Sequence, residues 1–248
     1  MNKPRHLLLA TSIAAITLAG CSREQAPAPE SAQPAAVAES TVDAAAVAAE
    51  FRTFLDENYA VDMARYPSTA SYRGIKTNHD KWNPASEAFR EETREINEAR
   101  LAQLQDFDRD ALDDASALSW DLYKTNLERQ LAADEFRHHR YVITQFRGPH
   151  TSVASFLINI HRVEDLADAE AYIGRLNNVG RWFDEVIEQM RIRQEKNFLL
   201  ADWQYPKMIE SSRNVITGVP FDKSGKDSTI WADFQGKVAS LAIDSAEK

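Results

Sequence analysis

The fold is decided by the stretch from Val163 to Gly218, which reads VEDLADAEAYIGRLNNVGRWFDEVIEQMRIRQEKNFLLADWQYPKMIESSRNVITG. Its apolar side chains recur at spacings of three and four, the period of a helix that buries one stripe. No proline lies between Pro149 and Pro206, so long helices are permitted here. Gly180, which follows two asparagines, is the expected break and predicts a pair of helices. The predicted buried stripe consists of Leu166, Tyr172, Ile173, Leu176, Val179, Phe183, Val186, Ile187 and Met190.

The composition predicts the same architecture for the rest of the chain. The 248 residues are 44% hydrophobic and include only eight glycines and nine prolines, four of the prolines within the first 34 residues. A low content of glycine and proline favours long helices over a fold with many turns. We therefore expect an all-α, multi-helix domain of antiparallel helices over residues 43–248.

Five further helices are predicted from capping residues and apolar spacing. The third is expected to bury a face of leucines, and segments 65–83 and 219–227 are expected to be irregular because of their prolines and glycines. The expected helix starts are Asp43, Pro84-Ala85-Ser86, Asp113 or Asp114, Ser152 and Ser228. The expected leucine face consists of Leu118, Leu122, Leu127 and Leu131.

The charge balance limits the classes of partner. The formal net charge is −9, which argues against nucleic acid as a partner and against an anionic membrane surface as the main one. The single cysteine excludes an intrachain disulfide.

The N-terminus predicts export. Lys3 and Arg5 precede an apolar run from Leu7 to Ala19, which is too short to span a membrane as a helix. The run ends Leu-Ala-Gly-Cys at Cys21, which resembles the lipobox of bacterial lipoproteins; the alternative is an ordinary signal peptide with a chance cysteine. Residues 1–20 are therefore predicted to be a lipoprotein signal peptide, and Cys21 is the predicted lipidation site.

The lipoprotein interpretation also predicts where the protein resides. Ser22 resembles the residue that follows the cysteine in lipoproteins sorted to the outer membrane. Residues 21–42 are rich in alanine, proline and glutamate and contain no aromatic residue, so we expect a disordered tether. The lipid on Cys21 would then hold the domain at the outer membrane, facing the periplasm.

The sequence contains no strong metal or catalytic motif. His138 and His139 are adjacent, and side chains of adjacent helical residues point about 100° apart, so they cannot share an ion. His150 and His161 are eleven residues apart, and no histidine is followed by glutamate. Asp106–Asp110 begins like a calcium loop, but its sixth and twelfth positions are alanines, which favours an acidic turn beside a helix. The aromatic residues and arginine that could line a cleft, or lie in the core, are Phe146, Arg147, Trp203 and Tyr205.

Several short segments in constant order resemble one family. They are PSTAS at 67–71 with Gly74, the run 118–157, RVED at 162–165, AEAY at 169–172, RWF at 181–183 and YP at 205–206. Together they resemble the bacterial family called domain of unknown function 885 (DUF885). The resemblance covers nearly everything after residue 43.

The resemblance implies part of a larger helical, metallopeptidase-like fold, in secreted or lipid-anchored proteins. The metal hallmark of that family is a His-Glu pair followed by Pro-Gly-His-His, in the C-terminal half of a chain more than twice this long. This chain has no match to the hallmark, so no catalytic or metal residue is carried over, and zinc is implied only for full-length members. We expect the N-terminal half of such a fold, either a fragment or a natural truncation.

Two functions follow as alternatives. In the first, the chain forms one wall of the peptide-substrate cleft of a zinc-dependent peptidase or related hydrolase, and is inactive alone. In the second, it is a non-catalytic helical lipoprotein that binds a partner or peptide in the periplasm.

Overall fold

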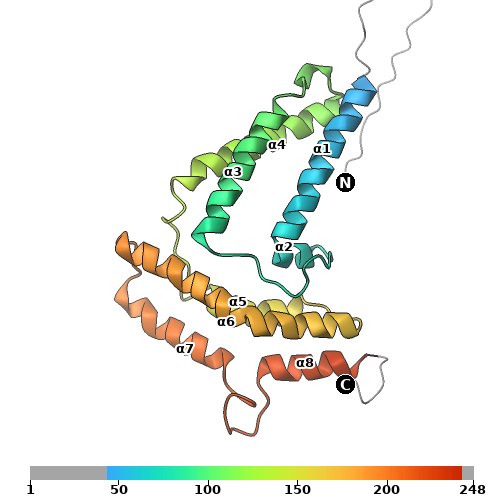
Figure 1. Cartoon of the computed structure of the whole chain (residues 1–248). Coiled ribbons are helices and arrows are strands. Elements are labelled where there is room, and N and C mark those ends of the chain that lie inside the picture. Colours follow the sequence, from blue (N-terminus) through green and yellow to red (C-terminus); the bar gives the residue numbers. More distant parts are fainter. Residues whose placement is uncertain (1–43, 242–248) are drawn as a thin grey trace, which may run out of the picture. The chain divides into compact units, whose positions relative to one another are not determined.

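The computed structural model describes residues 44–241, and these are organised in α-helices (Figure 1). The predicted all-α class is confirmed: no strand occurs within that range, where Val219 and Asp227 form an isolated bridge. The predicted signal peptide, the lipidation site Cys21, the tether and the capping residue Asp43 lie outside the described residues. The helices are α1 (Ala44–Arg65), α2 (Pro67–Tyr72), α3 (Glu87–Leu104), α4 (Asp114–Asp134), α5 (Pro149–Asn159), α6 (Leu166–Glu195), α7 (Tyr205–Val215) and α8 (Thr229–Ala239).

A first group of helices comprises α1 to α4. Helix α3 packs along α4, and α1 packs against α2 and α4. Phe51 and Leu104 are fully buried at its centre, where the rings of Phe51, Phe54, Phe107 and Tyr123 stack edge to face or tilted. Two predicted helix starts are confirmed by their caps: Ser86 Oγ accepts a hydrogen bond from Phe89 N, and Asp113 Oδ1 accepts one from Ser116 N.

A second group comprises α5 to α8. Helix α5 contacts α6, α7 and α8, and Ser228 caps α8 as predicted. Its core contains Phe156, Leu157 and Tyr172, together with Trp82. Trp82 belongs to the segment 73–86 that connects α2 with α3, so this connection is packed into the second core. None of the helices in the described part of the chain is long and apolar enough to cross a membrane.

The predicted break at Gly180 is wrong, because α6 continues without interruption from Leu166 to Glu195. A glycine inside a helix costs only about 1 kcal/mol relative to alanine. One continuous buried face over 30 residues outweighs that cost. The predicted pair divided at Gly180 is therefore absent, and the stretch instead contains α6 and α7, joined through residues 196–204.

The predicted stripe of α6 is only partly correct. Leu166, Ile173, Ile187 and Met190 are exposed, whereas Tyr172 and Val186 are buried. The residues of the inward face follow alternating spacings of four and three. Several of these residues are polar, so a pattern of apolar residues alone does not include them. The inward face consists of Asp168, Tyr172, Arg175, Val179, Trp182, Val186, Gln189 and Arg193.

Helix α4 is also turned differently from the prediction. Leu118 and Leu122 are 59% and 63% exposed, whereas Leu127 is buried. The inward side instead carries Trp120, whose indole Nε1 donates to Leu104 O at 3.0 Å, and Tyr123. Hydrogen bonding and aromatic packing therefore decide which side of α4 faces the core. The segment predicted to be irregular around Pro67 contains the short helix α2, which begins at that proline.

Because α6 is continuous, replacing Gly180 with alanine should stabilise the protein. A Cβ at this position meets no atom within 4 Å, so the helix gains alanine propensity without a clash. We expect the free energy of unfolding to rise by about 0.5–1 kcal/mol, measured by urea denaturation of the full chain. Gly174→Ala is the matched control on the same helix, because its Cβ would lie 2.9 Å from Asp80 Cβ and should destabilise. Loss of stability in Gly180→Ala would contradict the unbroken helix.

Candidate functional site

A buried polar cluster fastens the connection between α2 and α3 to α6. Arg175 is fully buried and donates from Nε to Lys81 O at 3.0 Å and from Nη2 to Ser71 Oγ at 2.8 Å. Its Nη1 lies 2.6 Å from His161 Nδ1. Because a guanidinium only donates, His161 Nδ1 must accept, and the opposite nitrogen Nε2 then donates to Asp168 O at 3.0 Å. His161 is therefore held as the neutral imidazole.

Burial dominates the electrostatics of this cluster. It lowers the pKa of His161 to about 3 and the pKa of Arg175 to about 10. His79 stacks on His161 with ring centroids 4.1 Å apart, and burial and the charge of Arg175 lower its pKa as well. Burial alone would raise the pKa of the Asp168 carboxyl. The hydrogen bond from Lys76 Nζ at 2.7 Å and the one from Glu164 N at 2.9 Å outweigh burial and lower it.

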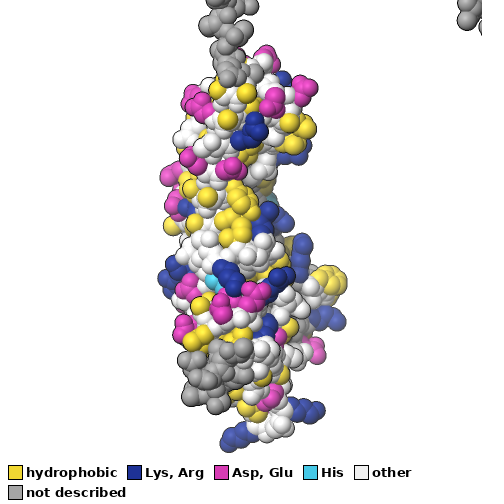
Figure 2. Space-filling model, turned by 90° about the vertical axis from the view of Figure 1, so that its right-hand side faces the viewer, with side chains coloured by type: hydrophobic (Ala, Val, Ile, Leu, Met, Phe, Trp, Pro, Cys, Tyr) yellow, Lys and Arg dark blue, Asp and Glu magenta, His cyan; other side chains and the backbone are white. Residues whose placement is uncertain are grey.

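Lys76 lies at the surface beside this cluster, and its Nζ forms ion pairs with Glu164 and Asp168. Acidic and basic side chains lie beside each other across one face of the molecule, with apolar patches between them (Figure 2). Arg175, His161 and Asp168 are engaged in internal hydrogen bonds, whereas His79 Nε2 is buried without a hydrogen-bond partner among the described residues. The cluster holds Lys81 and Trp82 in position beside α6.

The cluster predicts that acid destabilises the fold. Burial lowers the pKa of His79, His150 and His161 below the ordinary 6.5, so the unfolded chain binds protons that the folded chain excludes. Stability should therefore fall as the pH drops below about 6.5, by up to about 1.4 kcal/mol per pH unit for each histidine. Urea denaturation of the full chain between pH 7 and pH 5 measures the slope above the range in which most carboxylates titrate.

His161→Gln should reduce this slope, whatever its effect on stability at pH 7. His139→Gln is the control, because His139 is exposed and packs on the rings of Phe136 and Phe198, away from the buried cluster. An unchanged slope in His161→Gln would show that His161 is not held neutral.

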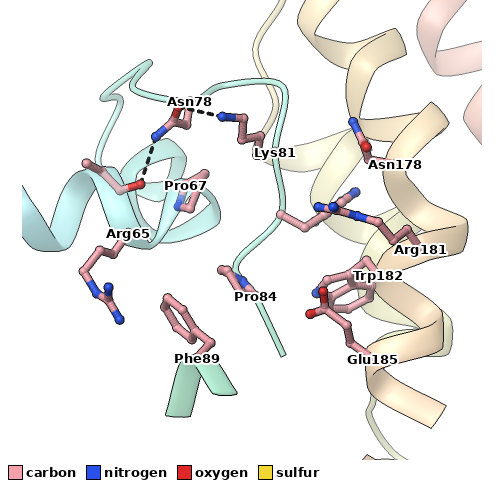
Figure 3. A pocket seen from close by; sticks show the side chains of 12 residues that line it. Arg65, Pro67, Asn78, Lys81, Pro84, Phe89, Asn178, Arg181, Trp182 and Glu185 are labelled. Carbon is pink, nitrogen blue, oxygen red and sulfur yellow. Dashed lines mark hydrogen bonds between the residues drawn. The ribbon is translucent and has the colours of Figure 1, made fainter. Parts of the chain in front are cut away.

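Beside the buried cluster lies a pocket of about 310 Å³, which we call the aromatic pocket (Figure 3). It is formed by the end of α1, the start of α2, the connection to α3, the start of α3 and one side of α6. Trp182 donates from Nε1 to Asn83 O at 2.8 Å and stacks on Trp82, so its ring is fixed in the wall. Arg65 lies over the ring of Phe89 at 4.5 Å. Apolar ring faces and charged groups therefore meet at one opening.

A larger pocket of about 690 Å³ lies on the other side of Trp182, and we call it the arginine pocket. Its walls are the start of α3, the connection between α4 and α5, the start of α5 and the second half of α6. Among residues 44–241, no carboxylate lines it. The arginines that line it are Arg90, Arg137, Arg140, Arg147 and Arg193.

A middle pocket of about 520 Å³ adjoins both of these. It shares Pro84 and Phe89 with the aromatic pocket, and Arg90, Arg137 and Arg140 with the arginine pocket. We call the three adjoining pockets the seam. The seam lies where the first helix group meets the second, and it combines side chains from both.

Glu87 joins three parts of the chain that border the seam. Its carboxylate lies 3.0 Å from His138 Nε2, accepts from Gln189 Nε2 at 2.8 Å, and lies 3.3 Å from Arg137 Nε. Burial alone would raise its pKa, but the hydrogen bonds from His138 and Gln189 outweigh burial and lower it. Glu87 is therefore an ionised group that joins α3, the connection after α4, and α6.

The structure separates the residues that the sequence analysis considered for a metal or a cleft. His138 contacts Glu87, His139 packs on Phe198, and His150 is buried in α5. His161 meets His79, a pairing that was not predicted. The acidic stretch 106–110 is a turn with a short 3₁₀ helix, as expected, in which Arg109 pairs with Asp121.

The predicted cleft residues are divided in the same way. Arg147 lines the arginine pocket, and Tyr205 lines a small pocket beside α7. Trp203 and Phe146 are 61% and 87% exposed, so neither is in the core. Within residues 44–241, no three side chains of histidine, cysteine, aspartate or glutamate are grouped closely enough to hold a metal ion.

The arginine pocket is the feature that sequence reasoning missed. Its members come from three separate parts of the chain and share no helical spacing, so no periodicity reveals them. One local signal was available: three arginines lie within the segment RHHRYVITQFR at 137–147. In a chain with a net charge of −9, that concentration of positive charge stands out.

Comparison with known proteins identifies a family and nothing more specific. Residues 67–248 match the sequence model of a family described as bacterial protein of unknown function (DUF885). No curated protein and no solved structure gives a match.

Proposed function

The chain belongs to the DUF885 family of bacterial proteins of unknown function, and we propose that its helical domain forms the ligand-binding wall of a cleft. The observation that carries this proposal is the seam, with three adjoining pockets of about 310, 520 and 690 Å³. Concave surfaces that combine aromatic walls with a few fixed polar groups are typical of ligand sites.

The chemistry of the seam suits a peptide. Phe89 and Trp182 offer ring faces for apolar side chains, and Asn178 and Glu185 line the same opening (Figure 3). The arginine pocket offers forked donors for charged groups. A ligand lying along the seam would therefore meet apolar, polar and cationic surfaces in succession, as an extended peptide requires.

The resemblance implies a zinc ion in full-length family members, but the described residues do not fit one. A catalytic zinc needs three protein ligands and an open position for water. His79 and His161 are the histidines that meet, yet both ring nitrogens of His161 are engaged, by Arg175 and by Asp168 O. The buried charge of Arg175 beside them also repels a cation. We therefore assign this domain ligand binding, and no catalytic step.

A second candidate is a non-catalytic lipoprotein that binds a partner in the periplasm. It is favoured by exposed apolar side chains before and along α7. These are Leu199, Trp203, Ile209 and Ile216. In that case binding would involve the region of α7 rather than the seam.

Tryptophan fluorescence of the full chain tests the proposal, because Trp82 and Trp182 stack on each other in the wall of the aromatic pocket. Unstructured peptides of mixed composition should bind saturably and change the emission, and mass spectrometry should find the peptides intact. Trp182→Phe should remove most of the change, whereas Trp203→Phe, which alters an exposed ring beside α7, should not.

Three results would contradict the proposal. One is the absence of any saturable binding, and another is a signal that depends on Trp203 instead of Trp182. The third is metal-dependent cleavage together with stoichiometric, sub-micromolar zinc binding in a calorimetric titration, because it would place a catalytic site in this chain.

A further inference from the structure

We infer that the arginine pocket binds an oxyanion group, a carboxylate or a phosphate, of the ligand that occupies the seam. The inference rests on the proposed function for the location of the ligand, and it adds the ligand's chemical class. It is carried by the charge, the positioning and the free hydrogen-bonding capacity of the arginines that line the pocket.

The charge in the pocket is not balanced by the protein. Five arginines line the pocket, and the carboxylates within ion-pair distance of any of them, in the described part of the chain, are Glu87 and Asp134. Both carboxylates contact Arg137, and Glu87 also lies 4.0 Å from Arg90. Glu87 is already shared with His138 and Gln189. A cluster of like charges destabilises the empty pocket, and an anion entering it would relieve that repulsion.

Arg193 holds the cationic segment in place. Its side chain is buried and donates from Nη2 to Arg137 O at 3.0 Å and from Nε to Arg140 O at 2.6 Å. Its remaining hydrogen bonds, from Nη1, go to the carbonyl and the side chain of Gln189. Burial and the neighbouring charge of Arg90 lower the pKa of Arg193, as expected for a cation that contacts only neutral acceptors. The backbone that carries Arg137 and Arg140 is thus positioned before any ligand arrives.

Three other arginines of the pocket have N–H donors that a ligand could use. The side chains of Arg140 and Arg147 are exposed, and neither pairs with a carboxylate among residues 44–241. Arg90 Nε is buried and makes no hydrogen bond to the described residues. The rest of the Arg90 side chain is partly exposed, so other donors of its guanidinium are open to a ligand oxygen.

The start of α5 adds to the positive character of the wall. Gly148, Pro149 and Ser152 line the pocket, and Gly148 supplies no side-chain cap to the helix. The N-terminal end of a helix carries a partial positive charge and attracts anions. Guanidinium forks match the two oxygens of a carboxylate or phosphate with paired hydrogen bonds. The pocket therefore selects an oxyanion rather than a single halide ion.

Calorimetric titration of the full chain at low salt tests this inference. The probes are pyrophosphate, citrate, a neutral peptide, and an acidic peptide in two forms, with a free C-terminal carboxylate and with an amidated end. Arg140→Gln and Arg147→Gln should each weaken binding of the preferred probe about tenfold, and raising the salt should weaken it further. Arg213→Gln is the matched control, because Arg213 is an exposed arginine on α7 that lines none of the three pockets. It should bind like the wild type.

The outcomes separate the two proposals. Preference for the free peptide over the amidated one assigns the site to a carboxylate end, and preference for pyrophosphate assigns it to a phosphate; either result supports the inference. Equal binding of acidic and neutral peptides, unaffected by Arg140→Gln and Arg147→Gln but lost in Trp182→Phe, would overturn the inference and leave the proposed function intact. Absence of binding by every probe and peptide would overturn both.

Discussion

Replacing Arg175 with methionine should lower the free energy of unfolding by about 3 kcal/mol. The change removes a buried cation, which by itself is favourable, because methionine has a similar length and carries no charge. It also leaves Lys81 O, Ser71 Oγ and His161 Nδ1 buried and without their donor, at a cost of about 1–3 kcal/mol each. The summed cost of the three unsatisfied acceptors is larger than the gain from removing the buried cation, so the variant is less stable.

Urea denaturation of the full chain at pH 7 measures this difference. Arg181→Met is the control, because Arg181 is an exposed arginine on the same helix with no ion pair among the described residues. It should change stability by less than about 0.5 kcal/mol. If Arg175→Met and Arg181→Met were equally stable, the buried cluster would not be what fastens the α2–α3 connection to α6.

Replacing Cys21 with alanine should abolish anchoring to the membrane. One myristoyl-like chain binds membranes with a constant of only about 10⁴ M⁻¹, whereas two or more chains anchor a protein stably. A lipidated Cys21 should therefore keep the protein in the membrane fraction of a Gram-negative host, with the domain facing the periplasm. The alanine variant should remain unprocessed or unlipidated.

Metabolic labelling with a palmitate analogue, followed by fractionation of the two membranes, checks this outcome. Ser22→Asp is a useful second variant, because it keeps the cysteine and changes the residue that resembles the outer-membrane sorting pattern. It should still be labelled but should move to the inner membrane. Labelling of Cys21→Ala would contradict the prediction, because a residue other than Cys21 would then carry the lipid.

The helix content could be predicted from the sequence because local signals determine it. Ser86, Asp113 and Ser228 are capping residues placed just before apolar, helix-forming segments, and each caps a helix in the structure. Gly180 misled the prediction, because a single glycine weakens a helix but does not end it when a long face is buried on both sides.

The buried cluster and the seam could not be predicted, because the residues of each meet only through tertiary packing. Arg175 and Arg193 belong to the inward face of α6, but their polarity hides them from a search for apolar spacing. Their burial becomes possible only when backbone carbonyls of the connections at 81 and 137–140 turn toward them. Leu118 and Leu122 show the converse error: an apolar face was predicted to be buried, but no helix in the described part of the chain covers it.

Whether ligands bind along the seam is tested most directly by hydrogen–deuterium exchange of the full chain, with and without a saturating acidic peptide. Backbone amides in the segments that line the seam, 78–94, 137–152 and 178–193, should exchange more slowly when the peptide is bound. Residues 205–215 of α7, which lie outside the seam, should exchange at the same rate in both samples. Protection confined to α7, with no change in the three seam segments, would contradict a ligand-binding cleft at this place.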